Sequence, residues 1–206
     1  MPKIRSSMPH LNGNIMAAVD FETTGVKAGW HEPIQVAVVL LNSDLRPMED
    51  IRPFNTNIKP EFPERQDPEA SRIHGLDMDN LLLYGLDRGR VQDLFIEWWE
   101  SIGLPFERKL VPLAHNWPFE HSFLRAWFGH DLTNRLWHGH ARDAMEYAVS
   151  LNDKAFMRGA KVPFSQVGLG DLCKHFGVIN PKAHDALHDC LAEAEVYRNL
   201  LNVDVL

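Results

Sequence analysis

Several features that define other classes of protein are scarce in this sequence of 206 residues. It contains only two cysteines, Cys173 and Cys190, which are too few for a disulfide scaffold, and their spacing supports no metal site. We therefore expect a reducing, cytoplasmic environment. No apolar run reaches the roughly 18 residues that a membrane-spanning helix requires, so no membrane association is expected. Residues 1–13 lack the apolar core of a signal peptide, and we expect a loose N-terminal tail there.

Positive charge is also limited. The chain has 21 Lys and Arg residues against 28 Asp and Glu residues, which gives a formal net charge of −7. This balance argues against a protein that coats nucleic acid through a broad basic face. It does not exclude a nucleic-acid enzyme, because divalent cations held by a few acids can supply positive charge locally.

The apolar content of 45% is enough for one compact domain covering residues 1–206. Three early segments have strand patterns and are joined by short, turn-rich links that suggest an antiparallel meander; they cover 15–21, 33–41 and 51–58. Later segments predict further strands at 109–116 and 132–138. They also predict helices at 68–76, 90–103, 117–129, 142–153, 168–178 and 185–201. This order of elements favours a single α/β domain.

The segment IMAAVDFETTG, from Ile15 to Gly25, places Asp20 and Glu22 at the end of an apolar strand. Residues i and i+2 of a strand point to the same face, so both carboxylates converge on one spot. Four acid pairs have this spacing, but the other three, including Glu193 with Glu195, lie in polar loops or on a predicted helix surface. The Asp20 and Glu22 pair fits either a divalent-cation site or a solvated strand end.

Two later segments carry further acids. Glu120 lies in the first turns of a predicted helix, where interaction with the helix dipole is a sufficient explanation. In HDALHDC, His184 and Asp189 share a target only if His184 lies on the loop before a helix and Asp189 lies one turn inside it. Asp185 then suits the N-cap, and His188 lies on another face with a surface role.

Together and in this order, these segments resemble the motifs of the DEDDh exonucleases, the DnaQ-like family that includes proofreading subunits of bacterial polymerases and ribonuclease T. VDFETTG resembles the first motif, AHNWPFEHSFL the second, and HDALHD the third motif, His-x-Ala-x-x-Asp. RIHGL resembles a segment near the nucleotide site of the family. The resemblance covers about residues 15–201.

The resemblance implies a ribonuclease H-like mixed sheet with helices on both faces. It also implies a metal-dependent 3′–5′ exonuclease that releases nucleoside 5′-monophosphates with two divalent cations, Mg²⁺ or Mn²⁺. The metal ligands would be Asp20, Glu22, Glu120 and Asp189, and His184 would be the general base. Single-stranded DNA is favoured over RNA, because DFETTG is closer to the proofreading branch than to the oligoribonuclease branch. A polymerase partner or a homodimer remains open.

One departure from the family pattern concerns Glu120, which stands where the family usually has aspartate. The additional methylene extends its reach by about 1.5 Å, and we expect its carboxylate to serve the second metal still. Expected substrate contacts, each with a structural alternative in packing, turns or capping, are Phe21, Thr23, Thr24, Gly25, His74 and Asn116.

Two other readings stay open at this stage. The His-Asp dipeptides at 184/185 and 188/189 suggest an HD-type metal phosphohydrolase, although that class is helical and does not use early strands for its acids. The second reading is an exonuclease fold that has lost activity and serves as a nucleic-acid or protein-binding module. Glu120 keeps this second reading open.

Overall fold

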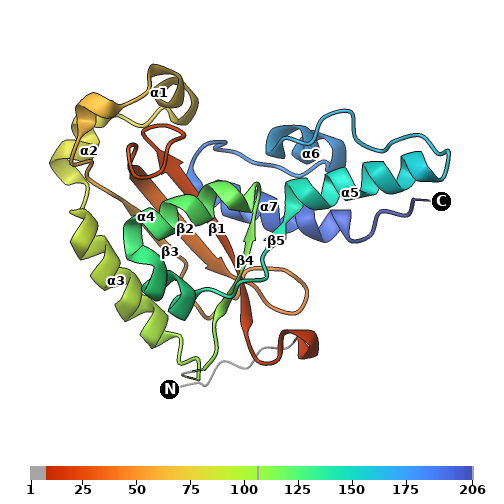
Figure 1. Ribbon diagram of the computed structural model, residues 1–206, viewed down its shortest axis with the longest axis horizontal. Coiled ribbons are helices and arrows are strands. Elements are labelled where there is room, and N and C mark those ends of the chain that lie inside the picture. Colours follow the sequence, from red (N-terminus) through yellow and green to blue (C-terminus); the bar gives the residue numbers. More distant parts are fainter. Residues whose placement is uncertain (1–7, 106, 206) are drawn as a thin grey trace.

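The computed structural model describes residues 8–105 and 107–205, which form a central sheet covered by helices (Figure 1). The sheet has five strands in the order β3-β2-β1-β4-β5. The first three strands pair antiparallel, whereas β4 runs parallel to β1 and β5 runs parallel to β4. The strands are β1 (Ile15–Thr23), β2 (Pro33–Leu40), β3 (Phe54–Asn57), β4 (Leu110–Ala114) and β5 (Arg142–Asp143). The predicted mixed sheet and antiparallel meander are therefore confirmed.

Helices cover both faces of the sheet, as predicted. Helices α3 and α4 pack on one face, and α5, α6 and α7 pack on the other face. The helices are α1 (Pro68–His74), α2 (Met78–Tyr84), α3 (Arg88–Ser101), α4 (Trp117–Leu136), α5 (Ala144–Met157), α6 (Leu169–Phe176) and α7 (Ala186–Leu200), with short 3₁₀ turns η1 (Pro9–Leu11) and η2 (Pro63–Arg65). None of the described helices combines the length and hydropathy needed to cross a bilayer.

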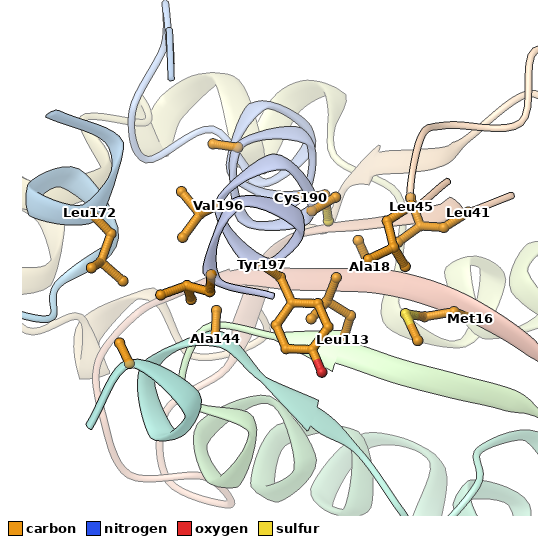
Figure 2. Packing of buried hydrophobic residues seen from close by; sticks show 14 of the residues in the cluster. Met16, Ala18, Leu41, Leu45, Leu113, Ala144, Leu172, Cys190, Val196 and Tyr197 are labelled. Carbon is orange, nitrogen blue, oxygen red and sulfur yellow. The ribbon is translucent and has the colours of Figure 1, made fainter. Parts of the chain in front are cut away.

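The two faces of β1 divide the core according to the two-residue period of a strand. Ala17, Val19 and Phe21 pack toward α3 and α4, whereas Met16 and Ala18 pack toward α7. Figure 2 shows this second face, where Met16 and Ala18 lie near Cys190 and Tyr197 of α7. By the same alternation, Asp20 and Glu22 continue the α7 face, which fixes the direction of both acids.

Helix α7 does not pack on the sheet through its largest apolar side chains. Leu191 on α7 and Leu201 at its C-cap are 38% and 48% exposed. The buried face instead carries small residues such as Ala186 and Cys190, and the Cys190 thiol donates a hydrogen bond to the carbonyl of Ala37 on β2. Small side chains let the helix approach the sheet closely. Both cysteines are buried free thiols.

The strand expected at 132–138 is wrong, because α4 continues through this segment to Leu136 after a kink at Gly129, where φ is 75°. The Thr133 hydroxyl donates a hydrogen bond to the Gly129 carbonyl across that kink. Leu132 and Leu136 pack into the core on the α3 and α4 face. Their four-residue spacing fits one side of a helix as well as one side of a strand, which explains the error.

Two predicted boundaries also differ from the structure. The third strand was expected to cover 51–58, but β3 is limited to Phe54–Asn57. Of the N-terminal segment expected to be a loose tail, residues 1–7 lie outside the described part. Residues 8–13 are ordered, because Met8 and Leu11 are buried around η1 and join the core on the α7 face.

Candidate active site

The site lies where the sheet opens between β1 and β4. The two strands pair only from Ile15 to Ala18, so β1 continues past the end of its parallel neighbour. After Ala114 the chain leaves β4, and α4 begins at Trp117. Asp20 and Glu22 therefore extend beside the start of α4. The carboxyl ends of parallel strands are common sites of ligand binding in α/β proteins.

Helix α7 supplies the third motif in the predicted arrangement. Asp185 is the N-cap and accepts a hydrogen bond from the His188 backbone, while Asp189 lies one turn inside the helix. His184 precedes the helix with a left-handed φ of 66° and an exposed side chain. Ligand atoms of Glu22, His184 and Asp189 all lie within 4.8 Å of one another.

The Asp189 carboxylate is oriented from two directions. Its Oδ2 accepts a hydrogen bond from the His184 backbone N–H at 3.0 Å, and its Oδ1 accepts one from the side-chain amide of Asn180. Both donors belong to the loop between α6 and α7. The position of the His184 loop is therefore coupled to the orientation of Asp189.

Glu120 enters the same site from the first turns of α4. Its side chain is only 3% exposed, and its Oε2 is buried without a hydrogen-bond partner. The start of α4 is held by Asp143, whose carboxylate accepts hydrogen bonds from the backbone of Asn116 and Trp117 at 3.2 and 2.7 Å. The longer side chain of glutamate is thus directed inward on a fixed helix end.

A single pocket of about 290 Å³ is lined by all five predicted catalytic residues: Asp20, Glu22, Glu120, His184 and Asp189. Three stretches of the chain contribute them, at residues 20–22, 120 and 184–189, so they are far apart in the sequence. The convergence that the resemblance implies is therefore present in the structure, and no single predicted member of the set is missing from the pocket.

The electrostatics of this pocket are those of carboxylates gathered without cationic partners. Burial raises the pKa of Asp20, and the charges of Glu120, Glu22 and Asp189 raise it further. Burial and Asp189 also raise the pKa of Glu22 to about 8. The pKa of Glu120 is raised, above all by burial. Burial raises the pKa of Asp189 too, although the hydrogen bonds from Asn180 and His184 oppose that shift.

The residues present fit divalent cations. Asp20 Oδ2 and Glu120 Oε2 are buried oxygen atoms with no hydrogen-bond partner. Carboxylate oxygens are the ligands that Mg²⁺ and Mn²⁺ accept, and a cation between them would remove the repulsion that raises these pKa values. The alternative of a solvated strand end does not fit, because Glu22 is only 8% exposed.

A fifth acid, Glu193, was assigned to a helix surface in the sequence analysis, and this was wrong. Its side chain is fully buried, and its Oε1 accepts a hydrogen bond from the backbone N–H of Val19 at 3.1 Å. Its Oε2 is buried without a partner. Burial raises its pKa, followed by the charges of Asp20 and Glu120. The available signal was its position four residues after Asp189, on the same side of α7.

Four of the six expected substrate contacts line the pocket: Phe21, Thr23, Gly25 and His74. Phe21 is only 4% exposed and packs edge-to-face on Trp127 at 5.8 Å, so packing accounts for most of its surface. The Thr23 hydroxyl donates to the Gly25 carbonyl. A Cβ at residue 25 would lie 2.4 Å from the His31 ring, which explains why the turn has glycine there.

The other two expected residues do not line the pocket. Thr24 is fully buried, and its hydroxyl accepts a hydrogen bond from the Glu32 backbone N–H, so it stabilises the turn. Asn116 is the N-cap residue of α4 with a φ of 80°, and it does not line the pocket. The turn therefore accounts for Thr24, whereas Asn116 makes no side-chain cap hydrogen bond and instead adopts a left-handed conformation that asparagine tolerates.

Two histidines in the pocket complete its polar lining. His74 Nδ1 accepts a hydrogen bond from the Leu76 backbone N–H, so the proton of the neutral ring lies on Nε2. This Nε2 is buried without a partner, and burial followed by the charge of His184 lowers the His74 pKa. His115, which sequence reasoning did not select, also lines the pocket, and burial lowers its pKa.

The other metal-hydrolase reading does not fit this architecture. An HD-type enzyme is helical, whereas Asp20 and Glu22 lie on β1, the middle strand of the five-stranded sheet. His188 bonds to the N-cap Asp185 through its Nδ1 at 2.7 Å, so this His-Asp pair belongs to the helix terminus.

Comparison with known proteins agrees with the fold. A family model described as Exonuclease, of the RNase T type, matches residues 17–94. Ribonuclease T of Baumannia cicadellinicola subsp. Homalodisca coagulata is 26% identical over 204 residues, covering 97% of this chain and 89% of that protein. The 3′-5′ DNA exonuclease Cap18 of Escherichia coli is 25% identical over 189 residues, covering 89% and 90%.

Among solved structures, E. coli Exonuclease I in complex with a dT13 oligonucleotide superposes with a TM-score of 0.71 at 18% identity. The match covers 92% of this chain but only 41% of that chain, so this protein spans about two fifths of Exonuclease I. The family model and the two relatives indicate a hydrolase of the 3′–5′ exonuclease class. The chain is thus similar to the DnaQ-like RNase T/exonuclease family, over residues 17–94 for the family model and over most of its length for Ribonuclease T.

Proposed function

We propose that this protein is a metal-dependent 3′–5′ exonuclease that removes nucleoside 5′-monophosphates from single-stranded DNA. The observation that carries the proposal is the convergence of four carboxylates and His184 on one pocket. A binding module would have no need for buried carboxylate oxygens without partners, because each such group is costly in the absence of a cation.

In this proposal Asp20, Glu22, Glu120 and Asp189 hold two divalent cations. When bound, the cations supply positive charge to the phosphate and to the attacking and leaving oxygens of the displacement. The chain itself contributes the fixed positions of the ligands. Glu22 and Asp189 are already within ligand distance of one another, and Asp189 is held by Asn180 and the His184 loop.

His184 acts as the general base that accepts a proton from the attacking water. Its ring is exposed on a loop, and it lies beside Glu22 and Asp189, so it can reach the scissile phosphate from the open side of the pocket. His74 donates its Nε2 proton to a substrate oxygen, for which it has no competing partner in the protein. Gly25 lets the terminal nucleotide approach the turn after β1.

DNA is the favoured substrate because Cap18 is a 3′-5′ DNA exonuclease and Exonuclease I has been crystallised with dT13. RNA is the second candidate, since another relative, matched over 204 residues, is Ribonuclease T. The two nucleic acids differ in the 2′-hydroxyl, so matched oligomers of the same sequence separate these candidates.

The decisive experiment follows mononucleotide release from 3′-labelled DNA and RNA oligomers, single- and double-stranded, with Mg²⁺ or Mn²⁺. We expect release from single-stranded DNA that stops on addition of a chelator. Asp20→Asn, purified in the same way, controls for contaminating nuclease and should be inactive. Oligomer binding without release by the wild-type protein would refute the proposal and favour the binding module.

A further inference from the structure

A group of exposed aromatic side chains lies outside the proposed catalytic set. Trp30 is 54% exposed and Phe62 is 38% exposed. The guanidinium of Arg65 lies over both rings, 4.3 Å from the centre of the Trp30 ring and 3.7 Å from that of Phe62. We call Trp30, Phe62 and Arg65 the stacking platform. Such cation–π contacts hold all three planar groups in a fixed arrangement while leaving aromatic surface open to solvent.

The platform is built on two segments that several hydrogen bonds join. The buried Glu32 carboxylate accepts from the backbone N–H groups of Glu61 and Phe62, at 3.1 and 2.8 Å. The Thr24 backbone donates to the Glu32 carbonyl, and the Asp67 backbone donates to the Thr24 carbonyl. These bonds connect the loop after β1 to the segment around η2. The exposed rings are therefore preorganised, which reduces the entropic cost of binding.

The platform adjoins the catalytic pocket. Gly25 and Asp67 line that pocket, and they belong to the same two segments as Trp30 and Arg65. A smaller pocket of about 130 Å³ is lined by Trp30, Phe62, Arg65 and His31. The His31 ring lies directly against Gly25, which lines the catalytic pocket, so the two pockets lie on either side of this turn. A chain whose end occupies the catalytic pocket can continue onto the platform.

The charge of the platform is suited to a polyanion. Among the described residues, neither Arg65 nor the exposed Lys27 on the adjoining loop has a carboxylate within 4.0 Å. These cations stand out on a chain with a formal net charge of −7. Aromatic rings with unpaired cations are the usual means of binding single strands, whose bases are free to stack. Paired bases in a duplex are already stacked on one another.

We propose that the stacking platform binds the nucleotides on the 5′ side of the scissile bond in a single-stranded substrate. A base stacks on the open face of Trp30, and the Arg65 guanidinium pairs with a backbone phosphate. This inference rests on the proposed function, because it assigns the path of the same substrate beyond the catalytic pocket. It makes the protein select single strands longer than the terminal nucleotide.

The test compares two substrates in Trp30→Ala. One is a single-stranded DNA oligomer of about 15 nucleotides, and the other is the p-nitrophenyl ester of thymidine 5′-monophosphate, which has a terminal nucleotide and no further strand. We expect KM for the oligomer to rise about 5- to 150-fold, the range of one lost base stack, while hydrolysis of the ester is unchanged. Phe156→Ala, at a side chain 74% exposed on α5, is the matched control and should change neither.

Arg65 variants separate charge from stacking. Arg65→Ala should weaken oligomer binding and lower the slope of log affinity against log salt by about one, whereas Arg65→Lys should keep that slope and lose affinity. Binding is measured by fluorescence anisotropy of a labelled oligomer. The thermal midpoint of Trp30→Ala, compared with that of the wild-type protein, checks that the variant is folded. Equal losses of activity on the ester and on the oligomer, or no loss on either substrate, would refute the proposed binding role of the stacking platform.

The proposed activity and the platform fail in different ways. If the wild-type protein releases no nucleotide, the exonuclease proposal fails, but anisotropy still decides whether Trp30 and Arg65 contribute to oligomer binding. If the wild-type protein is active and Trp30→Ala binds the oligomer as tightly as the Phe156→Ala control, the platform is refuted and the activity stands.

Discussion

At the level of single residues, two buried glutamates stand out, one in the pocket and one behind it. Glu120 brings a longer side chain to the position where the family usually has aspartate, and Glu193 adds a carboxyl group behind β1. Each has one buried oxygen without a partner. They differ in position, because Glu120 lines the pocket whereas Glu193 does not. We therefore expect Glu120 to act on cations and Glu193 to act on the strand that carries Asp20.

Substitution of Glu120 tests the first of these roles. Glu120→Gln keeps the shape of the side chain but removes the charge, and we expect kcat to fall by more than the roughly 10- to 100-fold that outer-shell changes cause. Glu120→Asp withdraws the carboxylate by about 1.5 Å and should alter the ratio of activity with Mg²⁺ to activity with Mn²⁺. If this ratio and the activity stay unchanged in Glu120→Asp, the additional methylene has no function.

Glu193 has a different signature, which is a change in stability. Glu193→Leu leaves the Val19 N–H without its acceptor and should lower the free energy of unfolding by about 1–3 kcal/mol.

Glu193→Gln keeps an acceptor for the Val19 N–H and cannot ionise. Because the folded-state pKa of Glu193 is raised, the wild-type protein loses stability above the normal glutamate pKa, so the Gln variant should gain relative stability as pH rises. Urea unfolding of metal-free proteins at several pH values measures both; equal pH profiles for Gln and wild type would contradict this.

Among the secondary-structure elements, the start of α4 decides where Glu120 lies, and Asp143 controls that start. Besides the Asn116 and Trp117 backbone, the Asp143 carboxylate accepts hydrogen bonds from Met145 and Glu146 as the N-cap of α5. One carboxylate thus caps two helices. The packing of α5 against the sheet is therefore coupled to the position of Glu120, the proposed metal ligand in the first turns of α4.

We expect Asp143→Ala to cost more than the loss of an ordinary cap. An N-cap aspartate typically contributes about 0.5–2 kcal/mol, and here two helix ends lose their acceptor, so the expected loss is about 2 kcal/mol or more. Asp77→Ala, at an exposed cap that serves only α2, is the matched control. Chemical denaturation of both variants gives the comparison. Equal losses at the two positions would show that the second helix end does not depend on Asp143.

For the molecule as a whole, the pocket concentrates negative charge that folding alone does not neutralise. Burial and mutual repulsion raise the pKa values of Asp20, Glu22, Glu120 and Asp189 together. The folded protein therefore holds protons that the unfolded chain releases. Stability and cation binding are linked through the same carboxylates, since a bound cation replaces those protons.

This linkage predicts a pH dependence with a definite sign. For Glu22, whose folded pKa is about 8 against an ordinary value of 4.5, its favourable contribution is complete below about pH 4.5 and is lost as pH rises to about 8. The thermal midpoint of the metal-free protein should therefore fall over this interval. Mg²⁺ or Mn²⁺ should raise the midpoint, more strongly at pH 8 than at pH 5. Calorimetry with and without chelator checks this, and a metal effect that is larger at the lower pH would contradict it.

Local sequence was sufficient for much of the sheet and for part of the site. The apolar run ending in Asp20-x-Glu22 predicted β1 and the shared face of its acids, because the two-residue period of a strand is a local property. The condition that His184 precedes a helix containing Asp189 was also predicted and is confirmed. The segment 132–138 was misread because its leucine spacing satisfies both helix and strand.

The sequence by itself determined which chemical groups this protein carries, the order of its motifs and the direction of neighbouring side chains. Only the tertiary structure decided that Glu120 and Asp189 meet Asp20 in one pocket, that Glu193 is buried, that Thr24 is excluded, and that Trp30 and Arg65 stack. The physical reason is the distance along the sequence over which each kind of interaction acts. Strand and helix periods act over a few residues, whereas burial and charge coupling depend on the packing of α4 and α7 against β1, which brings together residues far apart in the chain.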